Sequence, residues 1–164
     1  MDCVRELPVK GLCLKKMEES DIAYVMECME EAVLRSVSAD ESRDSEHWLP
    51  RLREGITLMH DSDPSSETFI LWQDEERLGM IWLGRGHDQF TREPAGYLYG
   101  IYVSEDARNG GLARWMMSFA EEWCTENGLD TFCLNVGSYN HDAEKAYRRL
   151  GFSPRSTIMS KRVR

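Results

Sequence analysis

Residues 108–113 read Arg-Asn-Gly-Gly-Leu-Ala and carry the clearest indication of a binding chemistry in this chain. They follow an apolar run and precede a stretch with helical periodicity. The first N–H groups of a helix have no intrahelical acceptors, and the helix dipole adds a partial positive charge there. Gly110 and Gly111 lack a Cβ, so the backbone can turn sharply and approach a ligand closely. The segment predicts a phosphate or pyrophosphate site, although a pair of glycines is equally typical of an ordinary turn.

Two common phosphate motifs are absent, since the chain has neither Gly-x-x-x-x-Gly-Lys-Ser/Thr nor Gly-x-Gly-x-x-Gly. The loop instead fits Gln/Arg-x-x-Gly-x-Gly/Ala, with Arg108, Gly111 and Ala113 in the fixed places. A second block further along the chain contains Leu134-x-Val136, Asn140-x-x-Ala143, Tyr147 and Gly151-Phe152. In this order, across residues 97–152, the two blocks resemble the GCN5-related N-acetyltransferase (GNAT) family.

The resemblance implies that acetyl-coenzyme A is the cosubstrate and that no metal is needed. The loop N–H groups would bind its pyrophosphate, and the backbone of the preceding strand would bind the amides of its pantetheine arm. Arg108 would add positive charge, or its side chain would point to solvent. The implied cofactor-binding residues are Ile101, Tyr102, Val103, Arg108, Asn109, Gly110, Gly111, Leu112, Ala113, Arg114 and Asn140.

Tyr147 is the expected catalytic residue, as a general acid toward the leaving thiolate. A phenol with a pKa near 10 is protonated at pH 7 and can donate its proton to sulfur. Spacing alone favours a core position instead, because Tyr147 shares an apolar helix face with Ala143 and Leu150. Asn140 also has two interpretations, since a helix N-cap explains it without any cofactor.

The general base is not identified by the sequence. Some family members carry a glutamate eleven residues before the first residue of the loop motif, and this chain has Tyr97 there. Nearby candidates are His87, Asp88, Glu93 and His141, each of which is also typical of an ordinary surface residue. A transferase of this kind also works without a dedicated base, since a fraction of the amine is always neutral.

Length and composition predict one domain over residues 1–164. No apolar run reaches about 18 residues, and the N-terminus lacks the pattern of a signal peptide. The five cysteines are scattered without a Cys-x-x-Cys pair, which favours reduced thiols, no metal site and a cytoplasmic location. A net charge of −9 argues against a nucleic-acid partner, and we expect no membrane partner and a monomer or homodimer.

The charges are unevenly distributed. Residues 17–76 contain 17 acidic side chains and 4 arginines, whereas residues 141–164 contain 7 basic and 2 acidic side chains. Solvated helix faces explain most of these charges. A functional alternative places a cationic acceptor near the acidic half, and especially near Asp40, Glu41, Asp44 and Glu46.

The periodicity predicts alternating strands and helices. Ser20, Asn140 and the pair Asn127-Gly128 are expected to bound helices. The expected strands cover residues 12–14, 68–72, 78–83, 97–103, 131–136 and 156–164, and the expected helices run from Ser20, around 41–59, from Leu112 and from Asn140. The resemblance implies an α/β GNAT fold: a twisted mixed sheet of six or seven strands with helices on both faces, splayed between strands 97–103 and 131–136.

Together these features predict an acetyl-CoA-dependent N-acetyltransferase that transfers acetyl directly to a primary amine of a small molecule or peptide. No cysteine of the matching blocks stands at a nucleophile position, which disfavours an acetyl-enzyme. The alternative is a non-catalytic acyl-CoA-binding sensor or regulatory module. The missing acid at Tyr97 favours this alternative weakly, and Tyr147 favours the enzyme.

Overall fold

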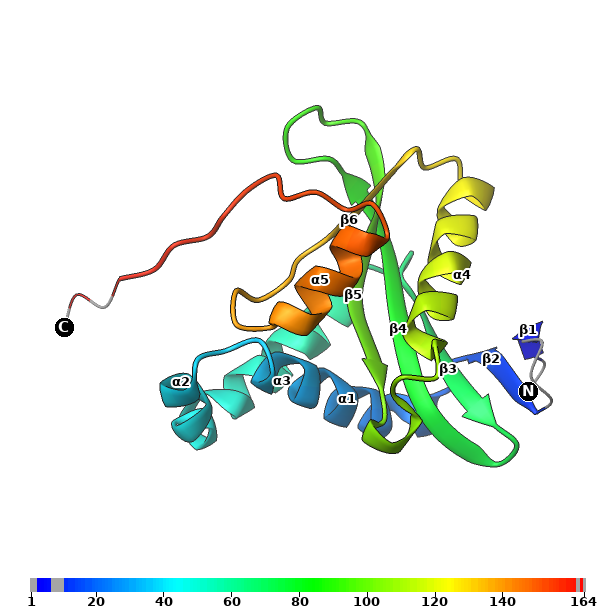
Figure 1. Ribbon diagram of the computed structural model, residues 1–164, viewed down its shortest axis with the longest axis horizontal. Helices are drawn as coiled ribbons and strands as arrows, with labels where there is room; N and C mark the ends of the chain where they lie inside the picture. The colour runs from blue at the N-terminus through cyan, green and yellow to red at the C-terminus, as the bar shows by residue number, and fades with distance from the viewer. Residues whose placement is uncertain (1–2, 7–10, 162, 164) are drawn as a thin grey trace.

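The computed structural model describes residues 3–6, 11–161 and 163 and contains a six-stranded sheet in the order β1-β2-β3-β4-β5-β6. Each strand therefore lies beside its neighbour in the chain (Figure 1). All pairs are antiparallel except β5 and β6, which are parallel and joined through a helix. The strands are β1 (Cys3–Glu6), β2 (Leu12–Lys16), β3 (Glu67–Gln73), β4 (Glu76–His87), β5 (Pro94–Val103) and β6 (Thr131–Leu134). The helices are η1 (Glu19–Asp21), α1 (Ile22–Leu34), α2 (Ala39–Arg43), α3 (Ser45–Ser62), η2 (Glu105–Ala107), α4 (Leu112–Glu126) and α5 (His141–Arg149).

Helices cover both faces of this sheet, as expected. The side chains of a strand alternate between its faces, so Leu71 and Ile81 pack toward α4, whereas Ile70 and Met80 pack toward α1 and α3. The apolar stripe of α4 supplies most of the helical part of the first core, and α5 adds half-buried side chains at its margin. Figure 1 shows α4 on one side of the sheet and α1 with α3 on the other. The predicted mixed fold with helices on both faces is confirmed.

The predicted splay between β5 and β6 is present. The two strands pair only from Ala95 with Thr131 to Leu98 with Leu134. Among the described residues, no strand pairs with residues 99–103 on that side. A β-bulge marks the start of the unpaired part, because Trp82 pairs with Gly100 and Leu83 pairs with Leu98, which leaves Tyr99 as the extra residue.

The start of α1 differs from the prediction, because Ser20 is not its N-cap. Glu18 and Asp21 instead form a capping box around η1, and α1 follows directly at Ile22. The Asp21 carboxylate accepts a bond from the Glu18 N–H at 3.0 Å and pairs with Arg77 at 2.7 Å. This buried ion pair joins residues far apart in the sequence, so local spacing could not reveal it.

The single helix expected around residues 41–59 is two helices. Ser38 and Glu41 form a capping box that starts α2 early, and the backbone of Asp44 separates α2 from α3. Pro50 lies inside α3 without ending it.

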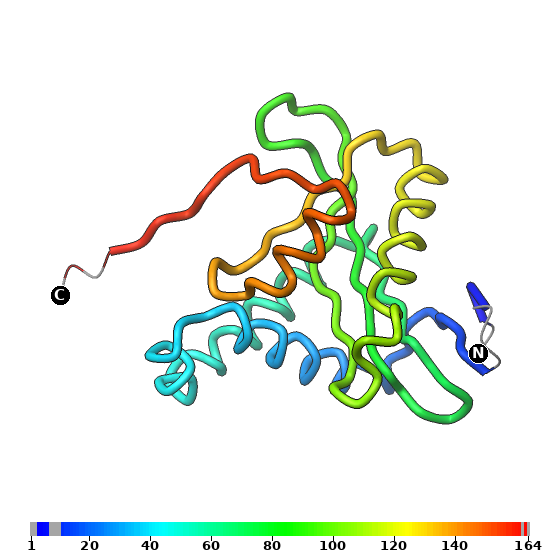
Figure 2. Tube along the Cα trace, in the orientation of Figure 1, coloured from blue at the N-terminus to red at the C-terminus, as the bar shows by residue number. Residues whose placement is uncertain are grey.

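The strand expected over residues 156–164 is not formed in its described part, residues 156–161 and 163; Arg162 and Arg164 lie outside the described residues. The segment leaves the body of the molecule in Figure 2, and Ile158 and Met159 are 92% and 89% exposed. An alternating pattern forms a strand only when a neighbouring strand pairs with it, and none lies beside this segment. β1 was not predicted because its exposed residues carry no alternation. Among the described residues, no helix is both long and apolar enough to cross a membrane.

Candidate active site

The loop before α4 presents a row of free backbone donors. Asn109 and Gly111 have φ of 67° and 78°, and Gly111 is the N-cap of α4 without any side-chain cap. No acceptor for the N–H groups of residues 109–114 lies in the described part of the chain. The first turn of α4 also contains no acidic side chain. Unpaired N–H groups at the positive end of a 15-residue helix are suited to bind an anion such as a pyrophosphate.

Arg108 fastens this loop to the end of β5 and does not point freely to solvent. Its Nε donates to the Val103 carbonyl at 2.9 Å, and its guanidinium lies 5.6 Å from the centre of the Tyr102 ring. The nearest carboxylate, that of Glu105, is 3.8 Å away. The Arg108 side chain therefore already bonds the Val103 carbonyl, one of the backbone groups expected to bind the pantetheine arm. The unpaired edge of β5 still leaves Ile101 beside the splay.

Tyr147 lies on α5 beside a cavity of about 250 Å³ along β6. Its ring packs on Phe152 with the ring centres 5.9 Å apart, and Phe152 packs on Phe132 at 5.6 Å. Burial raises the pKa of the Tyr147 hydroxyl to about 12, and this hydroxyl has no hydrogen-bond partner among the described residues. The ring is thus half-buried against the core while the residue also lines the cavity, and its role as a catalytic acid stays a prediction.

The loop and Tyr147 flank the splay without meeting. Leu112 and Trp115 at the start of α4, and Tyr147 on α5, pack against the same core on one face of the sheet. The cavity beside β6 is lined by Tyr147 but by none of residues 108–113. A ligand that joins both parts must lie along the unpaired edge of β5.

Asn140 is the N-cap of α5, as its position predicts. Its Oδ1 accepts from the Ala143 N–H at 3.3 Å, and its Nδ2 donates to the Ser36 Oγ at 3.5 Å. These bonds tie the loop after β6 to the end of α1. Contact of Asn140 with a cofactor stays a prediction.

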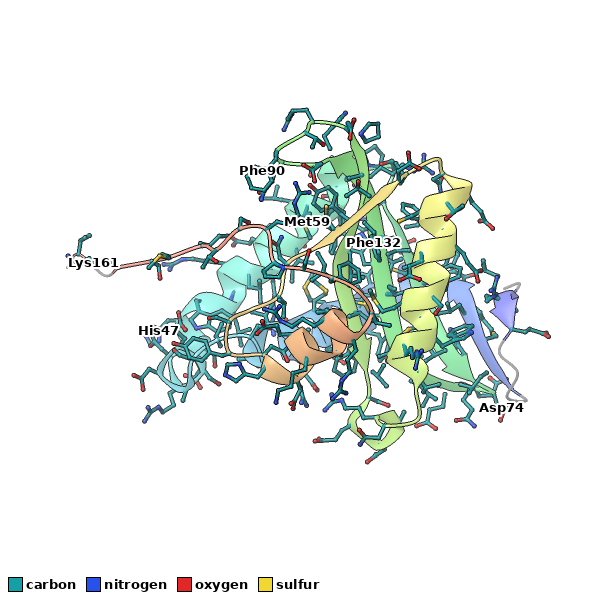
Figure 3. All side chains as sticks on the ribbon, turned by 45° about the horizontal axis from the view of Figure 1, so that its top comes forward. His47, Met59, Asp74, Phe90, Phe132 and Lys161 are labelled. Carbon is teal, nitrogen blue, oxygen red and sulfur yellow. The ribbon has the colours of Figure 1, made fainter. Side chains whose placement is uncertain are left out.

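Asp88 is unsuited to the role of general base. Its carboxylate is buried, accepts from the N–H groups of Phe90 and Thr91 at 2.8 Å each, and is paired with Arg155. These two backbone bonds, with the Arg155 guanidinium, lower the pKa of Asp88. The residue anchors the 88–93 loop, which projects from the sheet in Figure 3, where Phe90 is labelled.

The other candidate bases are exposed side chains that no hydrogen bond fixes in place among the described residues. His87 ends β4, Glu93 lies in the loop, and His141 is the first residue of α5. Tyr97, at the place of the missing glutamate, donates its hydroxyl to the His87 carbonyl at 2.8 Å, and burial raises its pKa. The structure thus offers no side chain fixed as a base at this end of β5 among the described residues.

Two tyrosine–carboxylate pairs on β5 were missed by sequence reasoning. Tyr99 donates to Asp63 at 3.0 Å, and Tyr102 donates to Glu31 at 2.8 Å. Burial, with the hydrogen bond to Asp63, raises the pKa of Tyr99 to about 12. One signal was available: a Cβ on Gly84 would lie 2.2 Å from the Tyr99 ring, so this glycine in a strand marks a close approach.

The acidic residues expected near an acceptor lie on α2 and at its junction with α3. Asp40 and Glu41 are on α2, and Asp44 and Glu46 are at the junction with α3, where all four are exposed. None of them lines the cavity beside β6 or the second cavity, which lies between α1 and α3. A role of these four charges beside the acceptor stays a prediction.

The sequence of this chain is similar to those of known acetyltransferases. A sequence model of the Acetyltransferase (GNAT) family matches residues 26–152. The protein called Uncharacterized N-acetyltransferase YobR, from Bacillus subtilis (strain 168), is 29% identical over 119 residues, which are 73% of this chain and 46% of that protein. The chain thus spans about half the length of this curated relative.

Solved structures share the fold. The crystal structure of a GCN5-related N-acetyltransferase from Ralstonia eutropha JMP134 superposes with a TM-score of 0.73 at 20% identity, covering 93% of this chain and 99% of that one. An aminoglycoside N-acetyltransferase, AAC(6')-Iy, in complex with CoA, superposes with a TM-score of 0.65 at 18% identity, covering 97% and 99%. At these identities the likeness concerns the fold alone.

Proposed function

The chain belongs to the acetyltransferase (GNAT) family, and we propose that it transfers an acetyl group directly from acetyl-CoA to a primary amine of a small molecule or peptide. The observation that carries the proposal is the uncapped start of α4, whose free N–H groups follow directly on the unpaired edge of β5. The free N–H groups at the start of α4 suit a pyrophosphate, and the unpaired edge of β5 suits an amide-bearing arm. A phosphate alone would need only the first.

The order of these parts supports one direction for the bound cosubstrate. The pyrophosphate site lies after Val103, so an arm along the free edge of β5 runs back toward Tyr99. Residues 99–103 span about 13 Å at the usual rise of a strand. The thioester then lies beside the bulge at Tyr99, where β5 and β6 separate.

The chemistry at that point uses Tyr147 as the acid. The lone pair of the neutral amine attacks the thioester carbonyl carbon, a C–N bond forms, and the C–S bond breaks. The Tyr147 hydroxyl donates its proton to the departing sulfur, and the surplus proton of the amine passes through water to the Tyr147 phenolate, which restores the acid. The raised pKa of Tyr147 keeps its hydroxyl protonated across the physiological range, so the proton is in place when the thiolate leaves.

Among the described residues no side chain near Tyr97 is fixed as a base, which favours the second candidate, a non-catalytic acyl-CoA-binding module. Thiol release from acetyl-CoA in the presence of an amine panel separates the two. Turnover of any amine excludes the module, whereas CoA binding without turnover supports it. The cytoplasmic location and the monomeric or homodimeric state remain predictions.

Tyr147→Phe tests the mechanism, since it keeps the ring and removes only the proton donor. We expect kcat to fall by roughly 10–10⁴-fold, the range of general acid catalysis, with CoA affinity unchanged. Initial rates of thiol release and calorimetric titration with CoA measure the two quantities. A kcat within about twofold of the wild type would leave Tyr147 as a core residue only. Tyr139→Phe is the matched control, because Tyr139 is an exposed tyrosine on the loop before α5.

A further inference from the structure

Four aromatic rings form a continuous row on the α1 and α3 face of the sheet. We call the rings of His60, Trp82, Tyr99 and Tyr97 the aromatic row. Successive ring centres in this order are 6.1, 5.2 and 6.4 Å apart. Tyr99 and Tyr97 are half-buried, so part of each ring is open to solvent.

Glycines of β4 make room for this row. A Cβ on Gly84 would lie 2.2 Å from the ring of Tyr99, and one on Gly86 would lie 3.0 Å from the ring of Tyr97. Both rings therefore lie directly across the β4 backbone. Trp82, Gly84 and Gly86 are alternate residues of β4, so all three face the same side of the sheet.

One end of the row closes an apolar cavity of about 150 Å³ between α1 and α3. Ile22, Val25 and Met26 line it from α1, and Ile56 and Thr57 line it from α3. Trp82 lies in its wall with 1% exposure, and its indole N–H has no acceptor among the described residues. The exposed wall of this cavity is mostly apolar, which suits an apolar body.

The middle of the row carries negative charge. Asp63 accepts the Tyr99 hydroxyl at 3.0 Å, and Asp61 lies beside His60 at the cavity. Both tyrosine rings stay neutral, so their faces attract a cation as the carboxylates do. Tyr99 is also the first residue of β5 beyond its pairing with β6, which places this charge at the vertex of the splay.

We infer that the aromatic row and the α1–α3 cavity are the acceptor site, and that the acceptor is a primary amine on an apolar, aryl-sized body. The apolar body occupies the cavity against Trp82, and the amine binds as an ammonium over Tyr99 near Asp63, beside the thioester. It loses one proton to water before its lone pair attacks. This inference rests on the proposed function for the transfer step, but amine binding is measurable without it. A carboxylate on the acceptor would meet Asp63 and Asp61, so amino acids are poor acceptors.

Three matched amines test the inference. 2-Phenylethylamine has the apolar body, ethylamine has the same ammonium without it, and phenylalanine adds a carboxylate. We expect kcat/KM for 2-phenylethylamine to exceed that for each of the others at least tenfold. Equal values for 2-phenylethylamine and ethylamine would overturn the role of the cavity, and a preference for phenylalanine would overturn the role of the carboxylates.

Substitutions locate the site. Thr57→Phe fills the cavity from an exposed position and should reduce the preference for 2-phenylethylamine over ethylamine to about twofold. Thr125→Phe is the control, because Thr125 on α4 is also exposed and donates to the carbonyl four residues earlier, as Thr57 does. An unchanged preference in the Thr57 variant would refute the assignment.

The charge is tested by Asp63→Asn, with Asp74→Asn at the turn between β3 and β4 as the control. Calorimetric titration with 2-phenylethylamine in the presence of CoA should show affinity reduced about tenfold in the Asp63 variant only. If no amine releases thiol but this binding pattern holds, the proposed function fails and the binding site stands. If no variant or amine produces heat, the site itself is wrong.

Discussion

Gly111→Val is the sharpest test of the anion site. Gly111 has φ of 78°, and a Cβ there would meet no atom within 4 Å. The substitution therefore creates strain but no clash. A β-branched residue in the left-handed region costs about 1–2 kcal/mol, which in a chain of this size lowers Tm by roughly 2–8 °C.

The effect on CoA binding should be much larger than this strain. The added side chain stands among the free N–H groups of residues 109–114, where the pyrophosphate must touch the backbone. A hydrogen bond to a charged group contributes about 1.5–3 kcal/mol, so losing one or two such bonds weakens CoA binding by roughly 100-fold. Calorimetric titration with CoA measures the change.

Gly128→Val provides a matched control at the other end of α4. Gly128 has φ of 67° and also has no atom within 4 Å of an added Cβ. The two variants should lose similar stability in thermal unfolding, but only the Gly111 variant should lose CoA affinity. Equal CoA affinity in both folded variants would refute the assignment of the loop.

Two further predictions concern the surroundings of the site. Gly84→Ala places a methyl group 2.2 Å from the Tyr99 ring and should displace this ring. We expect a lower Tm in thermal unfolding and a reduced kcat/KM for the amine in initial-rate measurements, with unchanged CoA affinity. An unaltered kcat/KM would contradict a role of the Tyr99 ring toward the amine. Asp88→Asn should lower Tm at neutral pH, because the Asp88 carboxylate has a lowered pKa in the folded protein. Its ionised form stabilises the fold above the unfolded pKa near 4, and this contribution is lost as pH falls through the folded pKa. The Tm values of the two proteins, measured from pH 7 to pH 3, should therefore converge, and a constant difference would show that ionisation of Asp88 is irrelevant.

Local patterns were enough to predict the elements that hold the anion site. The apolar stripe of α4, its end at Gly128 and the cap at Asn140 each depend on residues three or four positions apart. The order of the strands in the sheet was not predicted; in the structure each strand pairs with its neighbour in the chain. The splay was implied by the family resemblance, and its limit at Leu98 came only with the structure.

The pairs Tyr99–Asp63 and Asp88–Arg155 were missed because each depends on a contact across the chain. Asp63 meets Tyr99 over a separation of 36 residues, and Arg155 meets Asp88 over 67. Acidic residues were counted by position in the sequence, which favoured the exposed group around Asp40 over the carboxylate that contacts β5. The strand predicted in the C-terminal segment was wrong because the prediction used a local pattern alone. Alternating residues around Ile158 form a strand only where a partner strand pairs with them.

The parallel pair of β5 and β6 has a consequence for the order in which the molecule forms. The first five strands are joined as consecutive antiparallel neighbours, whereas β6 must wait for the whole of α4 to form and cross over. β6 is four residues long, all half-buried, and α5 behind it has no fully buried side chain. The last part to assemble is thus also the first to open locally. In the proposed function the thioester lies along this boundary, so we expect a bulky cosubstrate to enter by loosening β6 and α5 while the five-stranded meander remains folded.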